Sequence, residues 1–334
     1  MKVVFPYTYA GSGSDVWTMS MVEQLTKMGV DASATVYPKH YQFYPYLLKP
    51  QVRKNVADIV HTNSWTGGAF YHQGRFHVTT EHLVVHDPLV KPYKSFAQRT
   101  FHKMVYQHER SAFKRADVIT AVSNYSAEQV ALQFKVPAKA IQNGIDTTKF
   151  YPKTTSNFSE PYGKGKFKLL FVGNFSVRKG ADLLPKIMSK LGDNFILFTT
   201  TGLQDKAITE AENIVSIGKC NHQQLLEYYN YCDALLFPTR LEGLSLTTLE
   251  AMACGMPVVT SDCFSMPELI VDKKGGRLCP VDDVSAFVDA VISLADSPLH
   301  AKSMGEFNRE RAESSFSLTE MCSRYVKLYE ALLI

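Results

Sequence analysis

The sequence of 334 residues has no long apolar run. Its first apolar stretch, residues 2–5, is broken by Pro6, and no segment reaches the roughly 18 apolar residues of a membrane-spanning helix. Low-complexity tracts and internal repeats are also missing, which excludes disordered and solenoid classes. We therefore expect a soluble, cytoplasmic, globular protein, with peripheral contact at the inner face of the membrane as an alternative.

Cysteine is missing from the first half of the chain. None of the six cysteines has the C-x-x-C spacing of a metal cluster or redox motif, and all lie in the second half: Cys220, Cys232, Cys254, Cys263, Cys279 and Cys322. The sequence also contains no Asp-x-Asp motif that would suggest a divalent metal. We expect reduced, mostly buried thiols, no disulfide framework and no required metal.

The net charge of +4 is unevenly distributed. Residues 1–150 contain 17 Lys and Arg against 10 Asp and Glu, and the remainder contains 19 against 22. Eight of the ten histidines also lie in the first 150 residues. A solvated charged surface is the simpler interpretation, and an anionic membrane or a phosphorylated acceptor is the alternative. Since the basic residues are spread along the chain, nucleic-acid binding is not expected.

The order of elements predicts a doubly wound α/β fold in each half. In the first half a buried strand at 2–5 leads through Gly11 and Gly13 to a helix over 15–28 and a second strand at 31–36. Further strands are expected at 57–62, 76–80 and 117–122, with helices over 97–114 and up to residue 134. After a Pro-, Ser- and Gly-rich linker at 151–165, strands are expected at 168–172, 195–199, 214–217, 234–237 and 256–260.

The most informative segment is 235–259. It predicts a buried strand, a loop with Glu242, a helix capped by Ser245 and a second carboxylate, Glu250, inside that helix. Backbone N–H groups of Leu246 and Thr247 at the helix start would form an anion site suited to a phosphate.

This segment resembles the Glu-x7-Glu motif of the retaining glycosyltransferases of family 4, which have the GT-B fold. Other segments resemble the same family in the same order along nearly the whole chain: 116–123, 143–146 with Phe150 and Pro152, 171–173 with Lys179 and Gly180, 267–270, and 328–330. The resemblance implies two facing Rossmann-like domains with a cleft between them, and a C-terminal helix that crosses back to the first domain. The domains are expected at 1–150 (acceptor side), 166–315 (donor nucleotide-sugar side) and 316–334 (C-terminal helix), with the linker at 151–165.

The resemblance also implies roles for individual residues. Glu250 would hold the ribose hydroxyls of the donor, and Glu242 would contact the donor sugar. The amides near Ser245, Leu246 and Thr247 would bind the diphosphate, and Lys179 would neutralise its developing charge.

Two further roles are expected in the first domain. Gly13 would let the backbone approach the phosphates. His82 would orient the donor sugar or the acceptor, with His86 as the alternative.

Two positions depart from the family pattern. Asn174 stands where the family usually has arginine, so one cation of the expected pair is missing, and Arg178 beside Lys179 is the candidate replacement. Ser245 stands where many relatives have glycine, which is compatible with a helix cap.

The expected reaction is transfer of a hexose-type sugar from a UDP- or GDP-sugar, with retention, to a glycan, lipid or small-molecule hydroxyl. The leaving phosphate would help to take the acceptor proton. A nucleotide-sugar epimerase of the same architecture and a catalytically inactive nucleotide-sugar-binding protein are the alternatives. The aromatic and basic run at 37–49 could line the acceptor site or pack over the first domain.

Overall fold

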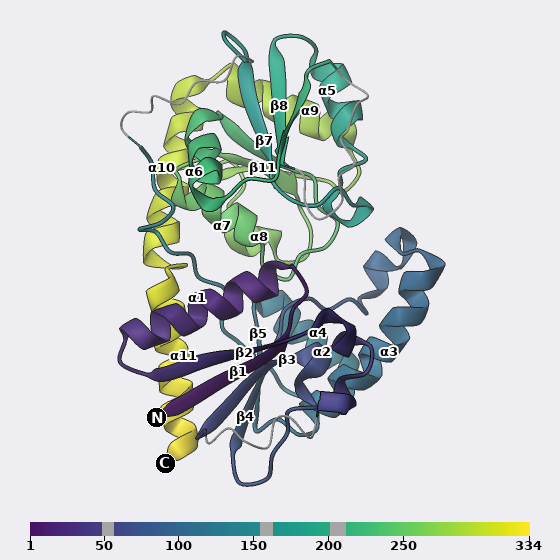
Figure 1. Ribbon diagram of the computed structural model, residues 1–334. Coiled ribbons are helices and arrows are strands. Elements are labelled where there is room, and N and C mark those ends of the chain that lie inside the picture. The colour runs from purple at the N-terminus through teal and green to yellow at the C-terminus, as the bar shows by residue number, and fades with distance from the viewer. Residues whose placement is uncertain (49–56, 154–162, 201–211) are drawn as a thin grey trace. The chain divides into compact units, whose positions relative to one another are not determined.

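The computed structural model describes residues 1–48, 57–153, 163–200 and 212–334 (Figure 1). The chain divides into two compact units: Met1–Asn143 together with Leu318–Ile334 form unit 1, and Gly144–Ser317 form unit 2. Each unit contains a six-stranded sheet in which every pairing is parallel. The predicted pair of doubly wound α/β domains is confirmed.

The sheet of unit 1 has the strand order β2-β1-β3-β4-β5-β6. Its strands are β1 (Lys2–Thr8), β2 (Asp31–Tyr37), β3 (Ile59–Asn63), β4 (Phe76–Glu81), β5 (Val118–Ala121) and β6 (Lys139–Ala140). The α-helices are α1 (Gly13–Lys27), α2 (Ser64–Gly67), α3 (Phe96–Phe113), α4 (Asn124–Phe134) and α11 (Leu318–Leu333), with 3-10 turns η1 (Lys39–Gln42), η2 (Pro45–Leu48) and η4 (Pro88–Tyr93).

Alternation along β1 assigns its side chains to two cores. Val3 and Phe5 belong to the cluster formed by α1 and α11, whereas Val4 packs with Phe70 on the opposite face of the sheet. The C-terminal helix contributes six buried residues to the first cluster, from Leu318 to Tyr329, and lies beside α1 (Figure 1). The prediction that this helix packs on the first domain is therefore confirmed.

The sheet of unit 2 has the order β12-β11-β10-β7-β8-β9. Its strands are β7 (Phe167–Phe171), β8 (Phe195–Thr200), β9 (Ile214–Gly218), β10 (Ala234–Phe237), β11 (Val258–Ser261) and β12 (Gly276–Cys279). The helices are α5 (Leu184–Leu191), α6 (His222–Tyr231), α7 (Leu246–Ala253), α8 (Met266–Leu269), α9 (Val284–Ala295) and α10 (Pro298–Ser314), with the 3-10 turn η5 (Val177–Lys179). The central strands are fully buried, as Leu169–Phe171 and Leu235–Phe237 show, because helices cover both faces.

The unit boundary differs from the expected domain boundary at residue 150. Residues 144–150 belong to unit 2, because Phe150 packs its ring on His222 and Tyr229 of α6, at centroid distances of 4.6 and 5.9 Å. Residues 154–162 of the expected linker lie outside the described residues. The C-terminal boundary falls at 317/318.

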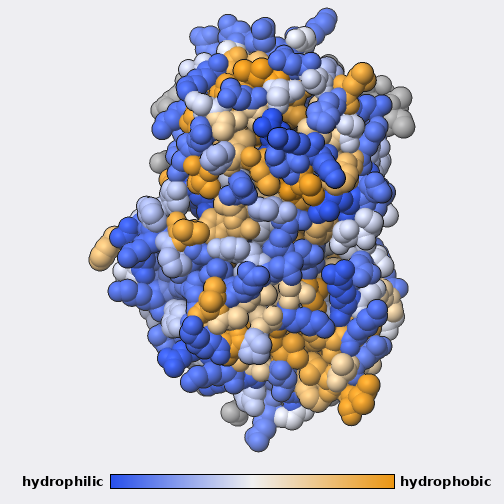
Figure 2. Space-filling view, turned by 180° about the vertical axis from the view of Figure 1, so that it is seen from behind, coloured by the Kyte–Doolittle hydropathy of each residue, from blue (hydrophilic) through white to orange (hydrophobic). Residues whose placement is uncertain are grey.

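On the face shown in Figure 2, hydrophilic side chains predominate and apolar ones are exposed in groups between them. Across the described ranges, no helix has the length and apolar character needed to span a membrane.

Candidate functional site

The candidate donor site of unit 2 lies where the strand order of its sheet reverses. β7 and β10 are neighbours there, and the chain leaves their carboxyl ends in opposite directions around the sheet. Loops that follow two such strands leave a crevice in which α/β proteins bind ligands. The loop after β7 contains Arg178 and Lys179, and the loop after β10 contains Glu242.

The backbone of the first loop is held in a fixed shape. Ser176 caps η5 by accepting a hydrogen bond from the Lys179 N–H, and Gly180 follows with a φ of +70°. A Cβ atom at Gly180 would lie 1.8 Å from the carbonyl oxygen of Pro238, so only glycine fits where the two loops touch. The glycine thereby fixes the position of Lys179.

The Lys179 side chain is mostly buried and lies between apolar and acidic groups. Its Nζ lies 5.1 Å from the centre of the Phe237 ring and 4.0 Å from Glu242 Oε1. Burial lowers the pKa of Lys179, and the carboxylates of Glu242 and Glu250 partly offset that effect. The lysine therefore lies within the electrostatic reach of both glutamates of the motif.

Arg178 joins Lys179 at the same carboxylate. Its Nη1 donates to Glu242 Oε1 at 3.0 Å and to the carbonyl of Leu241 at 2.8 Å. Adjacent residues of a loop often point in different directions, but here both cations face Glu242. Asn174, where the family usually has arginine, is exposed in the loop after β7.

Arg240, which sequence reasoning missed, links the two loops. Its guanidinium donates two hydrogen bonds to Asp182, at 2.6 and 2.9 Å, and one to Asp282 at 2.6 Å. A further bond reaches the carbonyl oxygen of Val177 in η5. The side chain is only 5% exposed, so this arginine ties η5 to the segment that carries Glu242.

Helix α7 begins directly after the Glu242 loop. Ser245 is its N-cap, as predicted, and accepts from the Thr248 N–H at 3.2 Å. The amides of Leu246 and Thr247 lie in the first turn, where an α-helix offers no internal acceptor. The start of α7 thus presents donors and the positive end of a helix dipole to an anion.

Glu250 lies on α7, one turn beyond these amides. Its Oε2 accepts from the Tyr229 hydroxyl at 2.8 Å. Burial raises the pKa of Glu250 to about 7, and the Tyr229 hydrogen bond and Lys179 limit the rise. Glu250 is therefore poised between its charged and neutral forms near neutral pH.

In unit 1 the structure places Gly13 at the first position of α1, where it is exposed. The loop before it is closed by Asp15, whose Oδ2 accepts from the N–H groups of Ala10 and Gly11 at 2.9 and 2.6 Å. These two amides are thus already bonded within the loop, and sequence reasoning did not identify Asp15.

His82 follows β4 directly and approaches the end of β3. Its Nε2 donates to Asn63 Oδ1 at 2.8 Å, and its ring meets the Trp17 ring edge-on at 4.8 Å. Burial lowers the pKa of His82 to about 3, so the imidazole is neutral and its Nδ1 is left as an acceptor. Such a nitrogen can orient a hydroxyl group.

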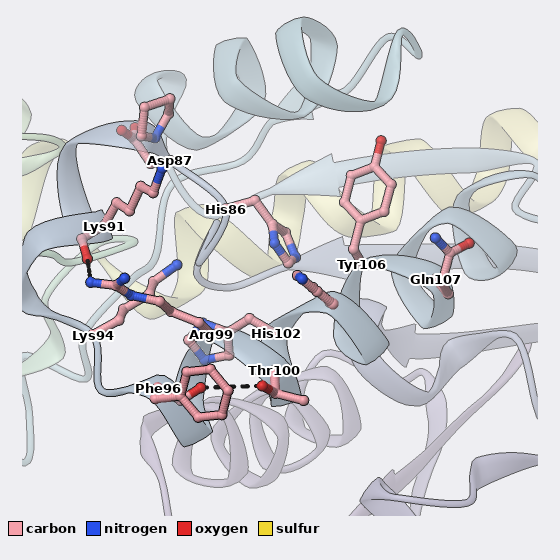
Figure 3. Close-up of a pocket in the computed structure, with 12 residues that line it drawn as sticks. His86, Asp87, Lys91, Lys94, Phe96, Arg99, Thr100, His102, Tyr106 and Gln107 are labelled. Carbon is pink, nitrogen blue, oxygen red and sulfur yellow. Dashed lines mark hydrogen bonds between the residues drawn. The ribbon is translucent and has the colours of Figure 1, made fainter.

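His86, the alternative to His82, lies in a different environment. Its Nε2 is 2.7 Å from Glu109 Oε2, beneath a pocket of about 860 Å³ between the loop after β4 and helix α3 (Figure 3). Sequence reasoning missed this pocket because its residues come from separate elements and form no compact motif.

The run 37–49 packs partly over the first unit, and its proposed place at the acceptor site stays a prediction. Tyr37 and Leu48 are buried in the second core of unit 1, whereas Tyr44 and Leu47 are exposed. Phe43 packs against Phe101 of α3 at 5.3 Å. Lys49, the last residue of the run, lies outside the described residues.

No cluster of His, Cys, Asp and Glu suited to a metal ion occurs in the part of the chain that the structure describes. Four of the cysteines are buried: Cys232, Cys254, Cys279 and Cys322. Burial raises the pKa of Cys263, Cys279 and Cys322 to about 12.

Comparison with protein families gives two matches that together span most of the chain. Residues 13–149 match the model "Glycosyltransferase Family 4", and residues 152–311 match the model "Glycosyl transferases group 1". The boundary between the two matches falls close to that between the structural units.

Among curated proteins, the chain resembles the GDP-mannose-dependent alpha-(1-6)-phosphatidylinositol monomannoside mannosyltransferase of Mycolicibacterium smegmatis. The identity is 29% over 247 residues, which cover 66% of this chain and 64% of that protein. The chain thus spans less than two thirds of the length of this relative.

Among solved structures, sucrose-phosphate synthase from Thermosynechococcus elongatus superimposes with a TM-score of 0.86 at 18% identity, covering 100% of this chain and 99% of the other. Anabaena HepE in complex with UDP and glucose gives a TM-score of 0.76 at 15% identity, covering 99% and 100%. At these identities the similarity establishes a shared fold.

Proposed function

Because the chain belongs to glycosyltransferase family 4, we propose that it transfers a hexose-type sugar from a nucleoside diphosphate sugar to an acceptor hydroxyl. The observation that carries this proposal is the arrangement of Lys179 and Arg178 around Glu242, beside the start of α7. Nucleotide-sugar transfer requires an anion site next to groups that contact a sugar, and this part of unit 2 offers both.

The diphosphate would bind at the first turn of α7. The amides of Leu246 and Thr247 would donate to its oxygens, with Ser245 holding the turn in place. Lys179 would stabilise the charge that develops as the bond to the sugar breaks, and Arg178 would supply the second cation in place of the arginine missing at Asn174. A buried ammonium suits this role, since electrostatic stabilisation grows where water is excluded.

The two glutamates would bind the polar ends of the donor. Glu250, fixed by the Tyr229 hydroxyl, would accept from the ribose hydroxyls, and Glu242 would contact the sugar. In unit 1, His82 would orient a hydroxyl of the donor sugar or the acceptor through its free Nδ1, and the backbone at Gly13 would approach the phosphates.

We propose direct transfer with retention of configuration. The acceptor hydroxyl would attack the face from which the diphosphate leaves, and a phosphate oxygen would receive its proton. A divalent metal is not required in this scheme, because α7 and two cationic side chains can neutralise the leaving group. Transfer is accordingly expected to persist in a chelator.

The similarity of this chain to a GDP-mannose-dependent enzyme, and of its fold to a UDP-binding structure, supports UDP and GDP as the nucleotides to test. Calorimetric titration of UDP, GDP and ADP into the wild-type protein identifies the base. In Glu250→Gln, affinity for the preferred nucleotide should fall about tenfold, because the carboxyl that would accept from the ribose hydroxyls is replaced by an amide.

Glu310→Gln is the matched control, since Glu310 is an exposed carboxylate on α10 of the same unit. Unchanged affinity is expected there. Equal affinity in wild type and Glu250→Gln would contradict the assignment of Glu250, and no binding of any of the three nucleotides would contradict the proposed function.

A further inference from the structure

Four cationic and two imidazole side chains are among the twelve residues that line the pocket of unit 1. It is formed by the loop after β4, which includes η4, and by the first turns of α3 (Figure 3). Its volume of about 860 Å³ is in the range of sites that enclose a small ligand. The cations and imidazoles that line it are Lys91, Lys94, Arg99, Lys103, His86 and His102.

The positive charge of these residues is poorly compensated. None of the four cations forms an ion pair of 4.0 Å or less with a carboxylate of the described residues. The Lys94 ammonium donates to the carbonyl of Val85, and Arg99 Nη2 donates to the carbonyl of Lys91 at 3.3 Å. These neutral acceptors orient the side chains without cancelling their charge.

The one acidic lining residue, Asp87, is engaged on its own loop. Its Oδ1 accepts from the Leu89 N–H at 2.8 Å, and its Oδ2 accepts from the Tyr125 hydroxyl. It therefore balances at most one of the four positive charges.

The carboxyls beneath the pocket do not supply the missing negative charge. Glu109, bonded to His86, and Glu81, at the end of β4, are both fully buried. Burial raises the pKa of Glu109 well above its ordinary value and that of Glu81 to about 8. Neither carboxyl is a lining residue, so the lining itself keeps its excess of positive charge.

The pocket lies at the edge of the sheet where ligands are expected. The loop after β4 leaves the carboxyl end of a parallel strand, and His82 is the first residue of that loop. Parallel α/β sheets bind ligands beyond this edge.

We propose that this pocket binds a phosphoryl group carried by the acceptor. The identification of the ligand as the acceptor rests on the proposed transferase function. A phosphate monoester brings two negative charges and several acceptor oxygens, whereas a carboxylate would leave most of the four cations unpaired.

The experiment measures binding of glucose 6-phosphate, with glucose as the uncharged control, by calorimetry at saturating UDP or GDP. The nucleotide occupies the donor site, so the added phosphate reports on the pocket. Wild type should bind glucose 6-phosphate at least about tenfold more tightly than glucose, as expected for charge-assisted hydrogen bonds. Arg99→Gln and Lys103→Gln should each weaken binding by about tenfold.

Arg110→Gln is the matched control, because Arg110 is exposed on the same helix but does not line the pocket. An equal loss of glucose 6-phosphate affinity in Arg110→Gln would overturn the proposal. It would also be overturned if wild type showed no preference for glucose 6-phosphate over glucose and no vesicle binding that depends on Arg99. Nucleotide affinity is measured for each variant separately, so failure of the donor site is distinguished from failure of the pocket.

A second arm distinguishes a soluble from a lipid-linked phosphate. Phosphatidylcholine vesicles with and without phosphatidic acid are sedimented with wild type, Arg99→Gln and Arg110→Gln. Sedimentation that requires phosphatidic acid and Arg99 identifies a lipid-linked phosphate, and glucose 6-phosphate binding without sedimentation identifies a soluble one.

Discussion

Glu81 lies in surroundings that oppose its ionisation. The carboxyl is fully buried at the end of β4, and one oxygen accepts from the Leu83 N–H at 2.9 Å. Burial, together with the nearby Glu109, raises its pKa to about 8. The neighbouring His86 has its pKa lowered to about 4 by burial, so it does not offset the acid with a positive charge at neutral pH.

The raised pKa of Glu81 predicts a pH-dependent stability. In the unfolded chain this carboxyl ionises near its ordinary pKa of 4.5, whereas in the folded protein it keeps its proton until about pH 8. Unfolding therefore releases a proton in this window, and the free energy of unfolding falls as pH rises, by ~1.4 kcal/mol per pH unit for each such group. Glu81→Gln should make this slope shallower.

The measurement is urea unfolding from about pH 7 to about pH 8, in which the histidines with lowered pKa contribute the same opposing slope to wild type and variant. Glu128→Gln, an exposed carboxylate on α4, serves as control and should retain the wild-type slope. Identical slopes for wild type and Glu81→Gln would show that Glu81 is already ionised in the folded protein.

At the scale of elements, the short turn η5 owes its position to Arg240. This buried guanidinium contacts Asp182, Asp282 and the Val177 carbonyl at once. Lysine has a single ammonium and cannot reproduce the planar fork. In Arg240→Lys we expect η5 to loosen and Lys179 to move relative to Glu242.

The expected result of Arg240→Lys is a fall in turnover of roughly tenfold or more, because small displacements of charged groups are costly in catalysis. Steady-state kinetics measure the turnover, and calorimetry measures the affinity for the nucleotide. In Arg240→Met the fall in turnover should be larger, since all the hydrogen bonds of the guanidinium are lost. Arg277→Lys is the control, as Arg277 of β12 pairs with Asp272 and donates to Ser293, and neither partner belongs to the two loops. Turnover unaffected by either Arg240 variant would refute its role in positioning the loop.

Elements whose buried face is apolar could be predicted from sequence, and those held by small or polar residues could not. The buried runs of β7 and β10 and the Ser245 cap of α7 follow from local residues. Helix α10 was missed, because its packing depends on Gly305 and Asn308. A Cβ at Gly305 would lie 2.0 Å from the Gly255 carbonyl oxygen. The side-chain amide of Asn308 donates to two backbone carbonyls. Neither residue adds to an apolar periodicity.

The same limit applies to the candidate site. The residues of the Glu242 segment are close in sequence and could be named together. Arg240 and Asp182, or Glu81 and Glu109, meet through tertiary structure alone, because each pair joins separate loops or elements. A single sequence gives no local pattern for such pairs.

At the scale of the whole molecule, the chain returns to its first unit at the end. Tyr325 of α11 is fully buried in the core formed with α1, and its hydroxyl lies 3.2 Å from Thr120 Oγ1 and 3.3 Å from Thr80 Oγ1. Tyr329 contacts His61 Nδ1 at 2.6 Å in the same core. The last 17 residues are therefore structural parts of unit 1, although unit 2 directly precedes them in sequence.

This connectivity predicts that a substitution near the C-terminus destabilises the N-terminal sheet. Tyr325→Ala should cost unit 1 about 3–5 kcal/mol, the usual range for truncating a buried aromatic side chain. Amide hydrogen exchange should accelerate in β1 and β3 and change little in β10 and β11, because local stability follows the core to which a strand belongs. Phe287→Ala, in the core of unit 2, should give the opposite pattern. Equal acceleration in both sheets by either variant would mean that the two units unfold as one cooperative body, and α11 would then stabilise the entire chain.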